Sequence, residues 1–203
     1  DMTPNRADCL SVMGIARDLS AIYKKKLSMP KTAKLSNKTK SHVKGVNKRI
    51  STAYSILVIE DFDNSLATPK YIVDRLELCG ISQINFIVDI LNYVMLEIGQ
   101  PMHVFDKDKL NGDLDVRFAK KGEKINALDG NEYILSVDIP VISDNDGPQA
   151  IAGVIGSNNS SVDTDTSSII IESAFFTQNL IRKSAKKFRL QTESSYRFER
   201  GVD

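Results

Sequence analysis

The stretch LNYVMLEIGQPMHVFD, Leu91–Asp106, joins a helix-like apolar run to a strand through a Gly-Gln-Pro break. Apolar residues occupy nearly every face of the run before Gly99, which is typical of a buried helix. A glycine after the last periodic residue is a common helix stop, and a proline soon afterwards prevents the helix from continuing. With Asn85 as a capping residue, the sequence predicts a helix over 85–99 followed by a strand over 102–106.

Outward from this stretch, helices are expected on the N-terminal side and strands on the C-terminal side. One helix is predicted to begin with Asp8 as its cap, and another at Thr68-Pro69. Strands are predicted over 55–62, 115–119, 133–137, 139–143, 150–156 and 167–176, and a final helix over 177–190. We therefore predict an α+β fold, with a β-rich core, helices mainly in the first half and one helix near the C-terminus.

The composition is that of a globular protein. The chain has 203 residues, of which 41% are hydrophobic and 26% are charged, and a chain of this length buries a substantial core. No apolar run approaches the roughly 20 residues that a membrane helix needs, and the N-terminal residues lack a signal-peptide pattern. We expect a soluble, cytoplasmic protein without a membrane partner, built as one module in which an N-terminal helix and basic linker (1–50) precede an α+β core (51–203).

Positive charge is concentrated in the segment Lys24–Arg49, although the net charge is only +1. This segment holds nine Lys and one Arg without an acidic residue, which leaves 17 basic against 26 acidic residues elsewhere. Such a run is able to lie along a phosphate backbone. A solvated, flexible connection is the simpler interpretation.

The two cysteines, Cys9 and Cys79, lie in apolar contexts without CxxC spacing. Free cysteine is among the residues most often buried. We therefore expect two buried, reduced thiols, and neither a disulfide nor a metal site. Cys79 is expected on the buried stripe of the helix that begins at Pro69, together with Ile72 and Leu76.

Asp89 and Asn92 are polar residues on one face of the predicted apolar helix, because they are three positions apart. Buried polar side chains need partners or line a wet cavity. Hydrogen bonds to nearby backbone, tying the helix to the strand after Pro101, are the simpler interpretation. His103 lies in that strand and is able to face the same cavity as Asn92, as a donor, acceptor or proton carrier. A lone histidine without a nucleophile or metal-ligand partner is more often structural.

Two further residues are unusual for strand interiors. Gly153, in the run AIAGVIG, weakens a strand and commonly marks the close approach of a ligand or another backbone, or a bulge. Glu172, in SSIIIESAFF, is costly as an ionised side chain among Ile, Ala and Phe unless it is bonded. A recognition role and an ion pair with a nearby basic residue are both compatible with this position.

Six blocks of the chain resemble the successive signatures of the bacterial phenylalanyl-tRNA synthetase β subunit, in the order of that family. The blocks are TPNRADCLSVMGIARDL, RLELCGIS, VDILNYVMLEIGQPMHVFDKDKL, AIAGVIG, IIIESAFF and TESSYRFERGVD. The resemblance covers nearly all of the chain and identifies it with the editing module in the middle of that subunit. It departs from the family at Leu91, where threonine is usual, at residues 52–54 and at Gly156-Ser157.

The resemblance implies an ester hydrolase that removes tyrosine wrongly attached to tRNA(Phe). It assigns Asn92 and His103 to the catalytic part of the editing pocket, and Gly153 and Glu172 to substrate binding. Water is expected to attack the aminoacyl ester without a covalent intermediate, because no activated nucleophile is apparent. Asn92 and His103 would orient the reacting groups, and backbone N–H groups near Gly153 would stabilise the oxyanion.

The same resemblance implies that the fragment needs no cofactor, whereas the parent enzyme uses ATP and Mg²⁺ at a site on its α subunit. The expected partners are tRNA(Phe) carrying tyrosine and, in the parent heterotetramer, that α subunit. No phosphate-cradling glycine-rich loop occurs in this chain. A non-catalytic scaffold or tRNA-binding module of the synthetase is the alternative.

Overall fold

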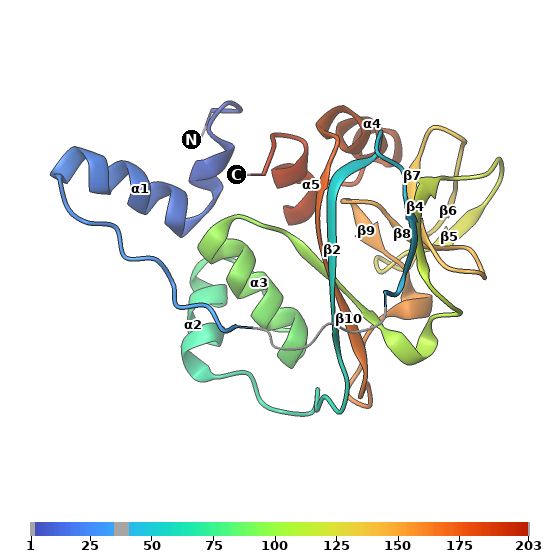
Figure 1. The fold of residues 1–203 in the computed structure, drawn as a ribbon, viewed down its shortest axis with the longest axis horizontal. Helices are drawn as coiled ribbons and strands as arrows, with labels where there is room; N and C mark the ends of the chain where they lie inside the picture. The colour runs from blue at the N-terminus through green and yellow to red at the C-terminus, as the bar shows by residue number, and fades with distance from the viewer. Residues whose placement is uncertain (1–2, 35–40, 203) are drawn as a thin grey trace.

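Three sheets and five α-helices make up the computed structural model, which describes residues 3–34 and 41–202 (Figure 1). The strands are β1 (Val43–Val46), β2 (Ser51–Ile59), β3 (Met102–Asp106), β4 (Leu114–Phe118), β5 (Lys124–Asn126), β6 (Glu132–Ile134), β7 (Pro140–Ser143), β8 (Pro148–Ile151), β9 (Ile155–Gly156) and β10 (Ile169–Phe176). The α-helices are α1 (Val12–Tyr23), α2 (Lys70–Leu78), α3 (Phe86–Ile98), α4 (Gln178–Phe188) and α5 (Glu193–Phe198). Short 3-10 turns are η1 (Ala7–Leu10), η2 (Lys107–Lys109) and η3 (Asn158–Ser160). The predicted α+β class is confirmed.

The sheets have the strand orders β1-β4-β7-β8-β9, β2-β10-β3 and β5-β6. Only β1 and β4 pair in parallel, and every other named pair is antiparallel. In the three-stranded sheet β10 is central and β3 is an edge strand. An edge strand has one side without a neighbouring strand, so β3 is able to border an open space.

The two faces of the three-stranded sheet support two separate cores. Side chains alternate between the faces of a strand, so Phe105 enters the main core beside the five-stranded sheet and α4, while Val104 packs against α3. On β10, Ile170 enters the main core and Ile169 packs on the side of α3. The sheet is therefore the partition between α3 on one side and the larger β-rich body on the other (Figure 1).

Helix α3 begins and ends where the sequence predicts. The Asn85 side chain accepts a hydrogen bond from Val88 N at 3.0 Å, and Gly99 adopts a φ of 83° at the C-terminal cap. The prediction that this helix is buried on every face is wrong. Its other positions are half-buried or exposed, and the buried ones are Ile87, Asp89, Leu91 and Met95. The reason is that one side of the helix packs on the sheet, where Ile87 and Leu91 cluster with Val104 of β3 and Ile169 of β10.

Two predicted helix caps are wrong. Asp8 lies in η1, and α1 is capped instead by Ser11, whose side chain accepts a hydrogen bond from Gly14 N. Thr68 makes no cap for α2, because the helix begins at Lys70 and the cap position is Pro69. The Thr68 hydroxyl instead donates a hydrogen bond to Asp89 Oδ2 at 2.6 Å.

Other expectations for the N-terminal half also need correction. Cys79 is exposed and Cys9 is half-buried, so the two thiols are not the buried pair that was expected; both are free. Cys79 falls outside the buried stripe because it is the C-terminal cap of α2, where the chain turns away from the core. The basic segment is not wholly a linker, since it includes β1, which pairs with β4.

Candidate functional site

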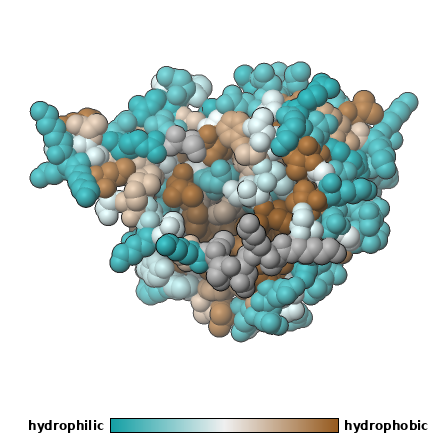
Figure 2. Space-filling view, in the orientation of Figure 1, coloured by the Kyte–Doolittle hydropathy of each residue, from teal (hydrophilic) through white to brown (hydrophobic). Residues whose placement is uncertain are grey.

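A cavity of about 340 Å³ lies beside the edge strand β3, between α3, the β8–β9 turn and α5. Four of its wall residues are those predicted from the sequence: Asn92 from α3, His103 from β3, Gly153 from the turn and Glu172 from β10. Most of the remaining wall is apolar, and Figure 2 shows hydrophobic side chains gathered in a hollow near the middle of the molecular face. The structure thus brings all four predicted residues to one space.

Glu172 lies in the wall of the cavity with only 4% of its surface exposed. Its Oε2 accepts a hydrogen bond from the Tyr54 hydroxyl at 3.2 Å. Desolvation by burial raises the pKa of Glu172 to about 8, while the bond from Tyr54 acts in the opposite direction. Of the two interpretations of Glu172, the ion pair is absent from the described residues. A phenol holds this side chain, which is mainly protonated at neutral pH.

Two properties of Glu172 leave it ready to contact a ligand. Its Oε1 makes no hydrogen bond within residues 3–34 and 41–202. Burial and the Glu172 charge also raise the pKa of Tyr54 well above its usual value, so Tyr54 stays a hydrogen-bond donor. One carboxyl oxygen is therefore fixed by the protein, and the other is free for a polar group in the cavity.

His103 stands directly opposite Glu172 in the β3–β10 register. Its ring packs edge-on against Phe105, with 4.5 Å between ring centroids, and makes no hydrogen bond to the described part of the chain. Burial lowers the pKa of His103 to about 4. The imidazole is therefore neutral at physiological pH, with one ring nitrogen able to donate and the other able to accept.

Asn92 and Asp89 behave differently although they share a helix face. Asp89 is fully buried, and its carboxylate accepts hydrogen bonds from the Thr68 hydroxyl at 2.6 Å and from Ile84 N at 2.8 Å. Asn92 lines the cavity, and its amide has no hydrogen-bond partner among the described residues. Asp89 is thus a structural residue that anchors α3 to the preceding loop, and neither residue makes the predicted tie to the strand after Pro101.

The predicted strand 150–156 is instead a tight hairpin, with Gly153 in its turn. Val154 N donates to Ile151 O at 2.9 Å, and Gly153 has a φ of 67° at the third turn position, as a type II turn requires. A Cβ on Gly153 would lie 3.0 Å from both Ile181 and Phe176. Only glycine combines a positive φ with the absence of a Cβ that would meet these side chains. The backbone here therefore forms a close-packed wall of the cavity.

Sequence reasoning missed several wall and support residues. Tyr54 was missed because the strand was expected to begin at Ser55, whereas β2 begins at Ser51. Gly156 was also missed, although a Cβ there would lie 2.4 Å from His103 Cε1. Thr192, Glu193 and Ser194 reach the cavity from α5, a helix signalled only by the Thr192 capping box.

Within the described ranges, no group of three or more His, Cys, Asp or Glu side chains is arranged to hold a metal ion. None of the described helices is long and apolar enough to cross a membrane. The polar side chains that line this cavity are Glu172, His103 and Asn92, together with Thr192, Glu193 and Ser194 at the start of α5.

Residues 51–203 match the family described as the B3/4 domain, and the chain belongs to this family. The phenylalanine–tRNA ligase beta subunit of Aquifex aeolicus is 48% identical over 203 residues, and that of Francisella tularensis is 46% identical over 206 residues. Each alignment covers 100% of this chain but 26% of the relative, so the chain spans about a quarter of these subunits. The resemblance to this synthetase subunit is confirmed over the whole chain.

The fold is also similar to a crystal structure of an N-terminal fragment of the phenylalanyl-tRNA synthetase beta subunit from Pyrococcus horikoshii. The TM-score is 0.52 at 19% sequence identity, and the match covers 89% of this chain and 56% of that one. At this identity the likeness concerns the fold alone.

Proposed function

We propose that the cavity hydrolyses the ester of tyrosine wrongly attached to tRNA(Phe), so that the chain acts as the proofreading part of a phenylalanine–tRNA ligase beta subunit. The observation that carries the proposal is the convergence of Asn92, His103, Gly153 and Glu172 on one largely apolar cavity. Its volume of about 340 Å³ falls at the small end of the range for small-molecule sites. An aminoacyl group, rather than a whole nucleotide chain, is the expected occupant.

Glu172 supplies the basis for choosing tyrosine over phenylalanine. The two amino acids differ by one hydroxyl, which an apolar synthetic site cannot strongly reject. A phenol in this cavity would bond the free Oε1 of Glu172, whereas a phenyl ring would leave that oxygen unpaired. Sites that read a hydroxyl through a buried polar group discriminate by about 10⁴ to 10⁵.

The proposed reaction is attack by water on the ester carbonyl at the 3′-terminal adenosine, which releases tyrosine and leaves the tRNA hydroxyl. His103 and Asn92 would position the ester or the water through hydrogen bonds, since both side chains line the cavity without a hydrogen-bond partner among the described residues. The low pKa of His103, about 4, makes it a weak proton acceptor at neutral pH. We therefore assign His103 to positioning of the reacting groups rather than to general-base catalysis. We assign the backbone N–H groups near Gly153 to stabilisation of the oxyanion.

The activity of the full subunit is part of the same proposal. We propose that the parent enzyme joins phenylalanine to tRNA(Phe) with ATP and Mg²⁺, at a site supplied by an α subunit partner. The editing step itself would use no cofactor, because ester hydrolysis needs only water and the groups already in the cavity.

The test is deacylation of Tyr-tRNA(Phe) beside Phe-tRNA(Phe) by the wild-type chain and by Glu172→Ala. The proposal expects rapid loss of tyrosine only, and loss of that selectivity in the variant. Glu77→Ala, which changes an exposed glutamate on α2, is the matched control. No deacylation above buffer, by the chain and also by a complete synthetase containing it, would contradict the proposal and favour a scaffold or tRNA-binding role.

A His103→Ala variant separates the two roles of the imidazole. Proton transfer typically contributes about 10² to 10⁴ in rate. Deacylation that stays within about tenfold of wild type supports positioning, and a larger loss at saturating substrate supports general-base catalysis.

A further inference from the structure

A basic groove runs along the junction of α4 and α5, next to the cavity. It is lined by three cationic side chains, Arg182, Lys186 and Arg189, together with Ala185, Gln191, Ser195 and Glu199. Positions 182, 185, 186 and 189 follow helical spacing and so lie on one side of α4. The three cations are therefore presented together to one concave surface.

The cations of the groove have no acidic partner in the part of the chain that the structure describes. Glu199 is the single acid in the wall, and its carboxylate already bonds Arg200 at 2.5 Å. Cations near a helix C-terminus stabilise the helix dipole, which accounts for Lys186 and Arg189 in or next to the last turn. That effect is confined to the last turn and does not account for Arg182, near the middle of α4.

The groove and the cavity are separated by a single turn of chain. Thr192, Glu193 and Ser194 line the cavity, whereas Gln191 and Ser195 line the groove. Adjacent Cα atoms are about 3.8 Å apart, so Ser194 and Ser195 place the two spaces on opposite sides of one short segment. A chain that enters the cavity past this segment would meet the groove.

We propose that this groove binds backbone phosphates of the RNA whose aminoacylated 3′ end enters the cavity. The inference rests on the proposed function, because RNA is its ligand. Three cations that have no acidic partner among the described residues lie beside a cavity for an aminoacyl group, and they complement a polyanion that continues from that group. The contacts carry no sequence information, so they hold the end of the RNA in place while the cavity selects the amino acid.

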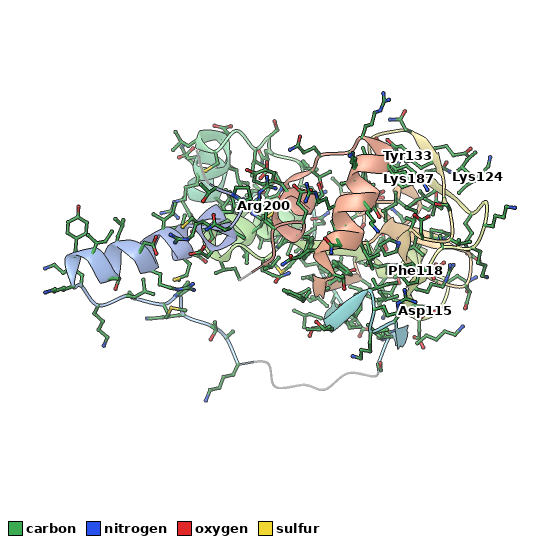
Figure 3. All side chains as sticks on the ribbon, turned by 90° about the horizontal axis from the view of Figure 1, so that it is seen from above. Asp115, Phe118, Lys124, Tyr133, Lys187 and Arg200 are labelled. Carbon is green, nitrogen blue, oxygen red and sulfur yellow. The ribbon has the colours of Figure 1, made fainter. Side chains whose placement is uncertain are left out.

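Another side of α4 offers a matched control. Lys183 and Lys187 have the same spacing as Arg182 and Lys186 but do not line the groove. In Figure 3, which views the molecule from above, Lys187 points toward Tyr133, on the far side of α4 from Arg200. Lys187 bonds Ser136 and lies 3.5 Å from Asp138. Two double variants thus remove equal charge from different sides of one helix.

The experiment measures binding of uncharged tRNA(Phe) at 50 to 200 mM salt by the wild-type chain, Arg182→Gln/Lys186→Gln and Lys183→Gln/Lys187→Gln. Two lost phosphate contacts make the slope of log affinity against log salt shallower by about 1.4 to 1.8, which is roughly a tenfold change over this range. The groove variant should show this change and the control variant should not.

Equal effects of the two variants, no effect of either, or no tRNA binding by the wild-type chain would each overturn the proposal. Hydrolysis of tyrosyl-adenosine by the wild-type chain tests the cavity separately, because this small ester lacks the backbone phosphates. Failure there, with groove-dependent tRNA binding intact, would count against the proposed hydrolysis and not against the groove.

Discussion

Glu172 and His103 are register partners on the adjacent antiparallel strands β10 and β3, and both line the cavity. Burial raises the pKa of Glu172 to about 8 and lowers that of His103 to about 4. An acid and a base thus stand side by side without charge at neutral pH. The desolvating cavity, rather than mutual attraction, sets their protonation.

The first prediction concerns stability against pH. Between about pH 6.5 and 8, Glu172 is protonated in the folded chain and ionised in the unfolded chain, so stability falls as pH rises. The free energy of unfolding should fall by on the order of 1 kcal/mol per pH unit in this range. His103 acts in the opposite sense between about pH 4 and 6.5, where the unfolded chain holds the extra proton, so the contributions of the two residues offset each other between about pH 4.5 and 6.5.

Glu172→Gln should therefore remove the decline between pH 6.5 and 8, since the amide stays neutral in both states. Urea denaturation at a series of pH values measures this difference. Glu77→Gln, an exposed site on α2, should keep the wild-type profile. An unchanged decline in Glu172→Gln would mean that Glu172 is ionised in the fold.

The second prediction concerns Tyr54, which supports Glu172 from β2. Tyr54→Phe removes the donor at 3.2 Å from Glu172 Oε2, and this bond lowers the pKa of Glu172. The pKa of Glu172 should therefore rise above about 8 in the variant, with a stability loss of about 1 kcal/mol. Carboxyl NMR titration measures the shift, and Tyr133→Phe, which removes a bond to the exposed Asp129, is the control.

The third prediction concerns Gly156, which lies against the His103 ring. The methyl group of Gly156→Ala would lie 2.4 Å from His103 Cε1, so the imidazole must move. Because His103 acts in positioning, the deacylation rate should fall, but by no more than in His103→Ala, that is within about tenfold. Gly45→Ala, whose methyl would meet only Asp115 Oδ1 at 3.1 Å, should leave the rate unchanged. Wild-type rates in Gly156→Ala would remove His103 from the proposed machinery.

The fourth prediction separates the two polar residues of α3. Asp89→Ala leaves the Thr68 hydroxyl and the Ile84 N–H without their acceptor and should cost about 2 to 4 kcal/mol. Asn92→Ala breaks no hydrogen bond within the described chain, so stability should change by less than about 0.5 kcal/mol while deacylation decreases. Thermal unfolding and the deacylation assay together check this division, which a large stability loss in Asn92→Ala would contradict.

The sequence by itself determined the features that depend on neighbouring residues. Asn85 and Gly99 fix the ends of α3, because a side-chain cap and a positive φ act over one helical turn. Alternation along β3 placed His103 and Phe105 on one face. The family resemblance, rather than any pattern of spacing, grouped Asn92, His103, Gly153 and Glu172 before the structure brought them to one cavity.

Tertiary structure alone decided the partners and charge states of those residues. Thr68 bonds Asp89 rather than capping α2, and Tyr54 rather than a cation holds Glu172. Both choices arise because segments distant in sequence meet across α3 and across the β2-β10-β3 sheet. Desolvation depends on which of these segments close over a side chain, and no property of the adjacent residues specifies that closure.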